Sequence, residues 1–310
     1  MDHPTRHFLR DALVFIAIGL GLYAVLLVFA EHRVRALAER NPFAQISLGP
    51  PPDIAIFGAS HAMPLGFEGI DNLVDAAAGQ EVATLAIEGA GIIPTGVIQT
   101  ALLARHTPAR IILTIDSFTF LSPQWNEERI TDSALLARAP YDRATMRALW
   151  QEPAARGSLW RYLTGFDKVN QMFTFGPDRS EAELTKFDRT YRPNSQIDDT
   201  RVAYLFPPAL PADVDRYMAA LERTILHAQA AGVRVEILLL PAPPRYHDRL
   251  PTAHQEVMEK IIALAARHDV AIVDHSALLP EDENYYDTDH LNRTGMTAYV
   301  GGAFGDFLRQ

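Results

Sequence analysis

Two short motifs at opposite ends of the chain contain residue types that together could transfer an acyl group. One reads Ile-Ala-Ile-Phe-Gly-Ala-Ser60-His, and the other reads Asp287-Thr-Asp-His290-Leu-Asn-Arg-Thr-Gly. An apolar run that ends in Gly-x-Ser places a serine on the turn after a strand. A serine attacks well when a histidine accepts its proton and a carboxylate fixes the histidine tautomer. We therefore predict Ser60 as nucleophile, His290 as general base and Asp287 as the orienting acid.

These residues also have simpler interpretations. Ser60 could be the N-cap of a helix, because a capping serine also follows a strand. His290 could be a surface histidine, and Asp289 competes with Asp287 as the acid because both lie just before His290.

The two motifs, in this order, resemble those of the SGNH (GDSL-like) hydrolase superfamily, over roughly residues 50–310. Gly-Ala-Ser-His in the first and His-Leu-Asn-x-x-Gly in the second are similar to its membrane-anchored branch. That branch includes proteins that O-acetylate alginate and other bacterial polysaccharides, and the D-alanylation protein of teichoic acids. The family's three-residue spacing selects Asp287 over Asp289 as the acid.

The resemblance also implies donors for the oxyanion that forms during acyl transfer. The backbone N–H of Ser60, expected at a helix N-terminus, is one, and that of Gly89 is another, with Gly91 as runner-up. The family usually has Gly-x-Asn-Asp after the third strand, whereas this chain has Asp116-Ser117 and no Asn there. Ser117 is the expected replacement donor, since an ionised Asp116 would repel an oxyanion. The absence of this Asn favours a specialised transferase over a broad esterase, and it is also compatible with a non-catalytic accessory role.

Three further residues are candidates for substrate binding. His61 follows the nucleophile, and Asp116 lies just before Ser117 after the third predicted strand. Arg245 follows the fourth predicted strand, where it could bind an anionic sugar or simply be solvated. No metal-binding or nucleotide-binding motif stands out, so no cofactor is expected.

A long apolar segment near the N-terminus predicts a membrane anchor. Residues 12–30 are uncharged and almost wholly apolar, about the length that crosses a hydrocarbon core. A cleaved signal peptide would have a shorter apolar region and a small-residue cleavage site, whereas a charged segment follows here. Flanking charges do not fix the orientation. The resemblance implies a single-pass protein of the inner (cytoplasmic) membrane with its catalytic domain on the periplasmic, extracytoplasmic side.

Composition excludes several classes of function. The net charge of -10 argues against a nucleic-acid partner, because phosphate binding needs a basic surface. The chain has no Cys, which excludes disulfides, thiolate catalysis and Cys-type zinc sites.

The rest of the chain alternates between strand and helix patterns. Five apolar runs (53–57, 82–87, 110–115, 233–240 and 270–273) are interspersed with helical patterns (94–105, 212–231, 252–268 and 294–308). This alternation predicts an α/β fold, a doubly wound three-layer sandwich with a five-stranded parallel sheet; the resemblance makes it the flavodoxin-like SGNH fold. Sites in such sheets form at the carboxyl ends of strands, where Ser60 is expected.

We expect four regions along the chain: an N-terminal flank (1–11), the transmembrane helix (12–30), a juxtamembrane linker (31–52) and the SGNH-like domain (53–310). Residues 118–205 break the alternation and are read as a helical insertion that caps the site, with helical patterns around 133–138 and 144–175. Its concentrated aromatic residues form either the apolar underside of a lid or a surface for sugars or a partner protein.

The resemblance implies a membrane-anchored serine O-acyltransferase that acts on a cell-envelope polysaccharide through an acyl-serine intermediate, with acetyl as the expected acyl group. One alternative is a carbohydrate or lipid esterase of the same fold. The other is an inactive scaffold partner of a multi-spanning membrane acyltransferase.

Overall fold

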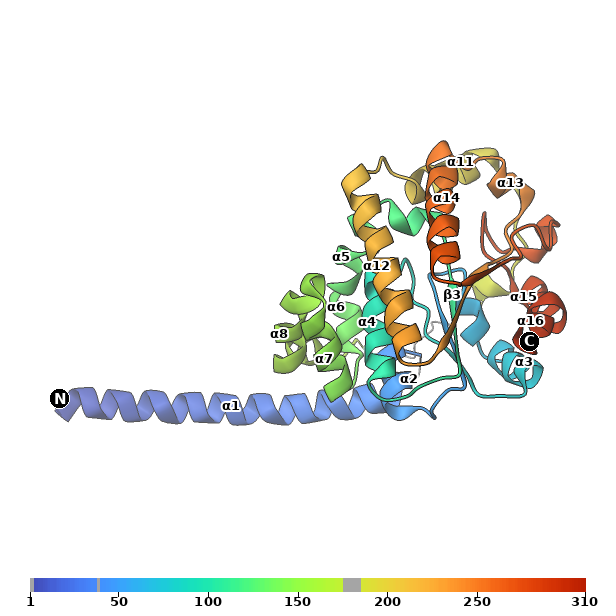
Figure 1. Ribbon diagram of the computed structural model, residues 1–310. Helices are drawn as coiled ribbons and strands as arrows, with labels where there is room; N and C mark the ends of the chain where they lie inside the picture. Colours follow the sequence, from blue (N-terminus) through green and yellow to red (C-terminus); the bar gives the residue numbers. More distant parts are fainter. Residues whose placement is uncertain (1–2, 38–39, 175–184) are drawn as a thin grey trace.

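The centre of the protein is a parallel β-sheet. A computed structural model describes residues 3–37, 40–174 and 185–310 (Figure 1). The strands are β1 (Ile54–Phe57), β2 (Val82–Thr84), β3 (Arg110–Thr114), β4 (Arg234–Leu239) and β5 (Ala271–Asp274), in the spatial order β2-β1-β3-β4-β5. All neighbouring pairs are parallel. This is the flavodoxin-like order, so the predicted five-stranded, doubly wound sheet is confirmed.

Helices cover both faces of this sheet, because successive residues of a strand point to opposite sides. Ala55 and Phe57 belong to one apolar core, and Ile54 and Ile56 belong to another. The first core includes side chains of α4 (Ile92–Leu103), α12 (Pro211–Ala230) and α14 (Thr252–Arg267). The second includes side chains of α3 (Ile70–Ala78), α15 (Arg293–Tyr299) and α16 (Gly305–Leu308). The predicted closing helix at 294–308 is interrupted by a π-helical turn at Val300–Phe304.

Several short helices lie between β3 and α12. They are α5 (Glu127–Ile130), α6 (Ser133–Ala137), α7 (Arg143–Gln151), α8 (Arg156–Thr164), α9 (Phe166–Gln171) and α11 (Ser195–Leu205). The helical pattern at 144–175 is therefore split in three. Pro153 opens a 3₁₀ turn after α7, and Gly165, with φ +67°, ends α8 in the left-handed conformation. A short helix α13 (Pro244–His247) follows β4.

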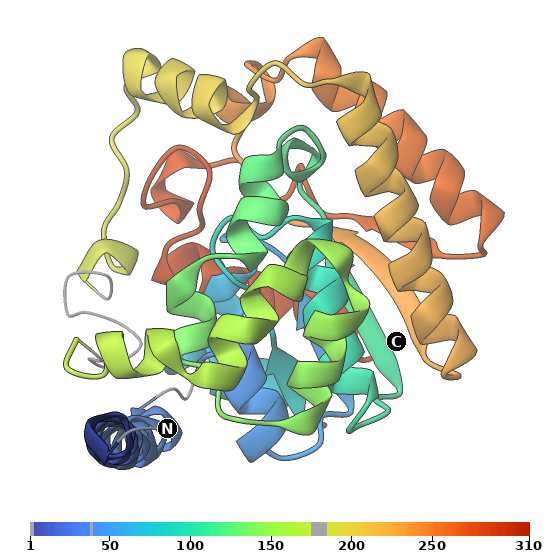
Figure 2. The ribbon, with the colours of Figure 1, turned by 90° about the vertical axis from the view of Figure 1, so that its left-hand side faces the viewer.

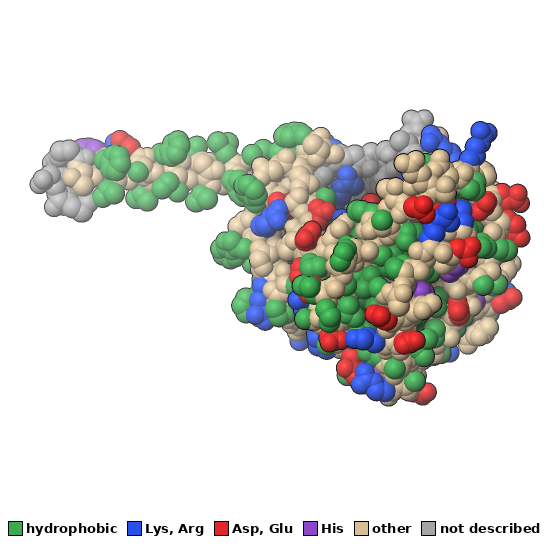
Figure 3. Space-filling view, turned by 90° about the horizontal axis from the view of Figure 1, so that it is seen from above, with side chains coloured by type: hydrophobic (Ala, Val, Ile, Leu, Met, Phe, Trp, Pro, Cys, Tyr) green, Lys and Arg blue, Asp and Glu red, His purple; other side chains and the backbone are tan. Residues whose placement is uncertain are grey.

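The N-terminal helix α1 (His3–Leu37) projects from the domain as a single rod, followed by α2 (Pro42–Leu48). Between His7 and Leu37 it is long and apolar enough to cross a membrane, and its most apolar window is not buried against the domain. Hydrophobic side chains line its length in Figure 3. This helix is therefore a candidate single-pass anchor.

Candidate active site

The structure brings the three predicted catalytic residues into one hydrogen-bonded chain. Ser60 Oγ lies 2.8 Å from His290 Nε2. The other ring nitrogen, His290 Nδ1, lies 2.9 and 3.1 Å from the two carboxylate oxygens of Asp287. This is the order of contacts that lets a histidine take a proton from a serine while a carboxylate holds the ring.

The turn after β1 positions Ser60. A Cβ atom on Gly58 would lie only 1.8 Å from Thr114 Oγ1 of the neighbouring strand β3, so this position requires glycine. Ser60 itself lies in a turn, and the next α-helix, α3, begins only at Ile70. The expectation that Ser60 opens a helix is therefore corrected: the tight passage beside β3, rather than a helix N-terminus, presents its hydroxyl.

A tightly bonded loop positions His290. Asp287 Oδ1 accepts the backbone N–H of His290 at 2.9 Å and that of Asp289 at 3.2 Å, in addition to the His290 ring. The ring of Tyr286 stacks on the His290 ring with centroids 5.4 Å apart. Asn292 then caps α15 by accepting the N–H of Gly295 at 2.9 Å. One carboxylate thus shapes the loop and orients the base.

Ser60 and Gly89, whose backbone N–H groups are the predicted oxyanion donors, both line one cavity. Gly89 has a φ of +61°. Neither N–H has a hydrogen-bond acceptor within the described part of the chain. The N–H of Gly91, the alternative donor to Gly89, donates to the carbonyl of Trp125 at 2.6 Å and therefore does not serve the oxyanion.

Ser117 does not join this group. Its hydroxyl is buried and lies 2.7 Å from His254 Nδ1, and it does not line the cavity. This placement argues against Ser117 as the replacement for the missing Asn donor. In the cavity wall, however, Trp125 Nε1 and Arg129 Nε are buried donors that have no acceptor among the described residues.

The cavity beside Ser60 has a volume of about 220 Å³. Its wall combines aromatic rings, three cations and the catalytic residues: Ser60, Met63, Phe67, Glu88, Gly89, Phe118, Trp125, Arg129, Lys186, Phe187, Arg201, Tyr204, Leu205, Tyr286, Asp287 and His290. A larger cavity of about 350 Å³ lies between α4, α7 and α12, but its lining has no nucleophile hydrogen bonded to a base. The smaller cavity is therefore the candidate site.

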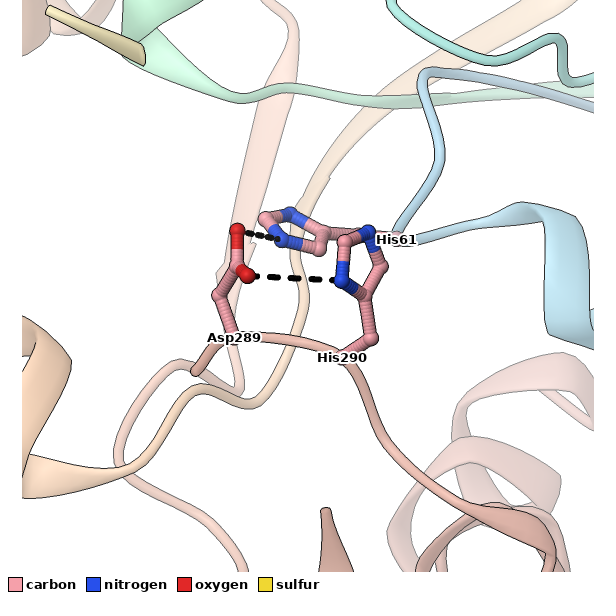
Figure 4. Close-up of side chains that lie close together, drawn as sticks. All are labelled: His61, Asp289 and His290. Atoms are coloured by element: carbon pink, nitrogen blue, oxygen red, sulfur yellow. Dashed lines mark hydrogen bonds and ion pairs between the residues drawn. The ribbon is translucent and has the colours of Figure 1, made fainter. Parts of the chain in front are cut away.

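A second buried network lies behind His290, and sequence reasoning missed it. Asp289 Oδ1 lies 3.3 Å from His290 Nδ1, and Asp289 Oδ2 lies 3.0 Å from His61 Nε2 (Figure 4). The other nitrogen of His61 lies 2.6 Å from Asp116 Oδ1. Arg201, on α11, also binds Asp289, at 3.1 Å. The network therefore links the turn after β1, the loop after β3 and the insertion to the loop that carries the base.

Neighbouring charges shift the pKa values of the residues in this network. Burial opposes a positive charge on His61, but the carboxylates of Asp116 and Asp289 outweigh burial and raise the pKa of His61 to about 10. Burial likewise opposes charge on His290, yet Asp289 and Asp287 raise its pKa above the usual value. For Asp289, burial is outweighed by His290, His61 and Arg201, which hold its pKa well below the usual range. His61 is thus an imidazolium between two carboxylates.

His61, Asp289 and His290 also offer three potential metal-ligand atoms within 4.8 Å of one another. The bonding of these atoms does not fit a metal ion. Asp289 already accepts from Arg201 and His61, and a guanidinium 3.1 Å from its oxygen would repel a cation. His290 Nδ1 faces Asp287 and its Nε2 faces Ser60. Hydrogen bonding accounts for the cluster.

None of the three residues predicted to bind substrate lines the cavity. His61 and Asp116 are bonded to each other in the buried network. Arg245 binds Asp282, donates at 2.8 Å to the carbonyl of Asp287, and stacks over Tyr191 with its Cζ 4.9 Å from the ring centroid. All three therefore support the catalytic loops, and the structure corrects their expected role at the substrate.

The raised pKa of His290 predicts a pH profile. The base works only when neutral, so the acid limb of kcat/KM should lie above pH ~6.5, the ordinary pKa of histidine. Asp289→Asn removes one of the two carboxylates that raise this pKa, and the acid limb should move to lower pH. The rate of aryl ester hydrolysis as a function of pH, normalised to the amount of folded enzyme, measures the acid limb of the wild type and that of the variant. An unchanged limb in Asp289→Asn would show that Asp289 does not act on His290.

Comparison with known proteins gives remote similarities. No family model and no curated protein matches this sequence. Among solved structures, a Bacteroides fragilis protein provisionally named an acylhydrolase is 13% identical, with a TM-score of 0.41; the match covers 86% of this chain and 94% of that one. A Streptococcus pneumoniae protein provisionally named a platelet activating factor is 13% identical, with a TM-score of 0.43 and 94% and 99% coverage. The case for function therefore rests on the geometry of the site itself.

Proposed function

We propose that this protein is a membrane-anchored serine acyltransferase that moves a short acyl group, acetyl, to a cell-envelope polysaccharide outside the cytoplasm. The observation that carries this proposal is the bonded chain from Ser60 through His290 to Asp287 at the wall of a cavity. A formed nucleophile and base also favour an active enzyme over an inactive scaffold of a multi-spanning acyltransferase.

The first half of the reaction forms an acyl-enzyme. Ser60 Oγ attacks the carbonyl carbon of the acyl donor while His290 Nε2 takes its proton. The oxyanion that develops on the carbonyl oxygen faces the N–H groups of Ser60 and Gly89, which line the cavity. As the intermediate collapses, the imidazolium of His290 gives its proton to the leaving group, and the acyl group remains as an ester on Ser60.

The second half reverses these steps with a different partner. A sugar hydroxyl loses its proton to His290 and attacks the acyl carbon. The bond to Ser60 Oγ breaks, and Ser60 recovers its proton from His290. When water takes the place of the sugar, the same steps make the protein an esterase, so exclusion of water from the cavity decides between the two activities.

The carboxylates around His290 serve both halves. His290 becomes an imidazolium twice in each cycle, and Asp287 and Asp289 lie 2.9 and 3.3 Å from its Nδ1. His61 and Arg201 in turn keep Asp289 ionised and in position. His61 is thus a positioning residue, because it acts on the base through Asp289.

The cavity supports a small acyl group and a carbohydrate. Its volume of about 220 Å³ is below the ~300–1,000 Å³ of sites for drug-sized ligands, which favours acetyl over a long acyl chain. The ring of Tyr204, which is 51% exposed, offers a face for a sugar ring. Three cations of the wall, Arg129, Lys186 and Arg201, outnumber its two carboxylates, Glu88 and Asp287, and this small excess of positive charge favours an anionic sugar.

Product analysis with a simple donor tests this proposal. The full-length protein in detergent would be incubated with p-nitrophenyl acetate, with and without an anionic oligosaccharide. We expect nitrophenol release, an acetyl adduct on the Ser60 peptide and acetylated oligosaccharide by mass spectrometry. Free acetate as the sole product, even with acceptor present, would make the protein an esterase. No nitrophenol release and no adduct would contradict acyl transfer altogether.

A further inference from the structure

The insertion carries several exposed apolar side chains, and its helices α7 and α8 lie on the side of the domain from which α1 projects (Figure 1). We call these side chains the insertion face: Trp150 of α7, Trp160 and Leu163 of α8, Phe166 of α9, and Phe173. Trp160 is 71% exposed and Phe166 is 57% exposed. In Figure 2, a view from the side toward which α1 extends, α7 and α8 lie in front of the sheet. These large apolar groups meet no partner within the described residues that would bury them.

The α8–α9 turn is fixed directly to α1. Tyr23 donates its hydroxyl to the carbonyl of Thr164 at 3.0 Å. Gly165 packs so closely on α1 that an added Cβ would lie 2.2 Å from Leu27 Cδ1. Farther along α1, Glu31 accepts the N–H of Tyr141 at 3.0 Å and pairs with the buried Lys168. The insertion therefore lies alongside α1 from Tyr23 onward.

The length of α1 decides where this contact lies relative to a bilayer. Between the charged pair Arg10–Asp11 and the contact at Tyr23 lie residues 12–22, which span about 16 Å of helix. A hydrocarbon core is about 30 Å thick and needs ~20 residues. If α1 crosses the membrane, the core must extend to about Glu31. Tyr23, Leu27 and the α8–α9 turn then lie within the outer part of the bilayer.

We propose that the insertion face is embedded in the headgroup and outer acyl region of the same membrane that α1 spans. Ala30 is the last residue of the apolar segment, and Tyr23 lies seven residues before it, or about 10 Å along the helix. This depth below the membrane surface matches the ~5–10 Å to which interfacial helices are buried. Tryptophan and tyrosine favour this zone because their rings are apolar at one end and polar at the other. The proposal rests on α1 as an anchor and is independent of the acyl-transfer chemistry.

Charge supports a lipid surface as the occupant. Helices α7 and α8 contain four arginines and no acidic residue, while Asp142 and Glu152 flank α7 and Arg161 pairs with Asp167. Arg143 and Arg147 are exposed on the same helix as Trp150. Basic residues beside apolar anchors bind anionic lipid headgroups near the membrane surface. The domain is then held flat against the membrane by two attachments, so it does not swing freely on α1.

The absence of cysteine makes this proposal testable by site-directed spin labelling of the full chain. Trp160→Cys and Phe166→Cys would each carry a nitroxide in phosphatidylcholine–phosphatidylglycerol vesicles that contain no other protein. Collision with oxygen reports lipid, and collision with a nickel chelate reports water. Ile262→Cys on α14 is the matched control, because Ile262 is 53% exposed and α14 lies away from α1 in Figure 1. Ile16→Cys within α1 marks the bilayer interior.

The expected order of the oxygen-to-nickel ratio is position 16 highest, positions 160 and 166 intermediate, and position 262 lowest. Labels at 160 and 166 that match position 262, with 16 in lipid, would overturn the proposal and leave the face for a protein partner. A water-exposed label at 16 would remove the anchor and overturn it as well. Replacing phosphatidylglycerol by phosphatidylcholine should lower the ratio at 160 more than at 16, because the arginines then lose their anionic partners.

Discussion

Replacing Ser60 by alanine, His290 by alanine, or both together is expected to lower kcat to nearly the same floor. The two side chains share one hydrogen bond of 2.8 Å. Ser60 attacks the acyl donor only when His290 takes its proton, so the loss of either side chain stops the same step. Members of such a unit are strongly non-additive, and each loss in a comparable enzyme is on the order of 10⁴–10⁶. Turnover of p-nitrophenyl acetate by the two single variants and the double variant measures the effect. Losses that multiply in the double variant would contradict a shared step.

Ser117→Ala is the matched control for this series. It removes a serine hydroxyl from the oxyanion loop, but that hydroxyl is bonded to His254 and lies outside the cavity lining. The variant should lose far less than the ~10²–10³-fold that removal of an oxyanion donor costs. A loss of that size with unchanged KM would restore Ser117 to the oxyanion site.

Asp289→Ala is expected to destabilise the fold strongly. The Asp289 side chain is fully buried and contacts His61 at 3.0 Å and Arg201 at 3.1 Å. Removal of one partner from a buried charge network leaves the others unpaired and costs about 3–5 kcal/mol. His61 can lessen this cost by losing its proton, because its raised pKa depends partly on Asp289. Chemical denaturation of the full-length protein in detergent measures the free energy of unfolding.

Asp215→Ala provides the comparison for Asp289→Ala. Asp215 forms an ion pair with Lys260 at 2.7 Å, but both side chains are about half or more exposed. An exposed pair of this kind contributes about 0–1 kcal/mol. Similar losses in the two variants would mean that the buried network does not stabilise the native state.

The fold could be predicted because its signals are local. Each strand is a short apolar run followed by a helical pattern, and burial on both faces of a parallel sheet produces that alternation. The ends of the helices were harder to predict from the sequence. Pro153 and Gly165 divide one apolar, helix-like stretch into α7, α8 and α9, and the mostly polar α11 has no periodicity that announces a helix.

The core of the site could be predicted because the fold forces it. Ser60 follows β1, and His290 lies on a loop that returns to the same end of the sheet, so motif order alone brings them together. The surrounding network could not be predicted. His61 and Asp289 are 228 residues apart, and which face a turn residue presents depends on packing. The same holds for Ser117 and Arg245, whose partners His254 and Asp282 belong to other elements.

Labelling with a serine-directed fluorophosphonate tests the central claim most directly. The reagent reacts with a serine only when a base has activated it, so it reports the contact between Ser60 and His290 without knowledge of the substrate. We predict one labelled site in the wild-type protein, on the Ser60 peptide, no label in Ser60→Ala and a strongly reduced rate in His290→Ala. A folded wild-type protein that takes no label, or a Ser60→Ala variant that is labelled equally, would contradict the account.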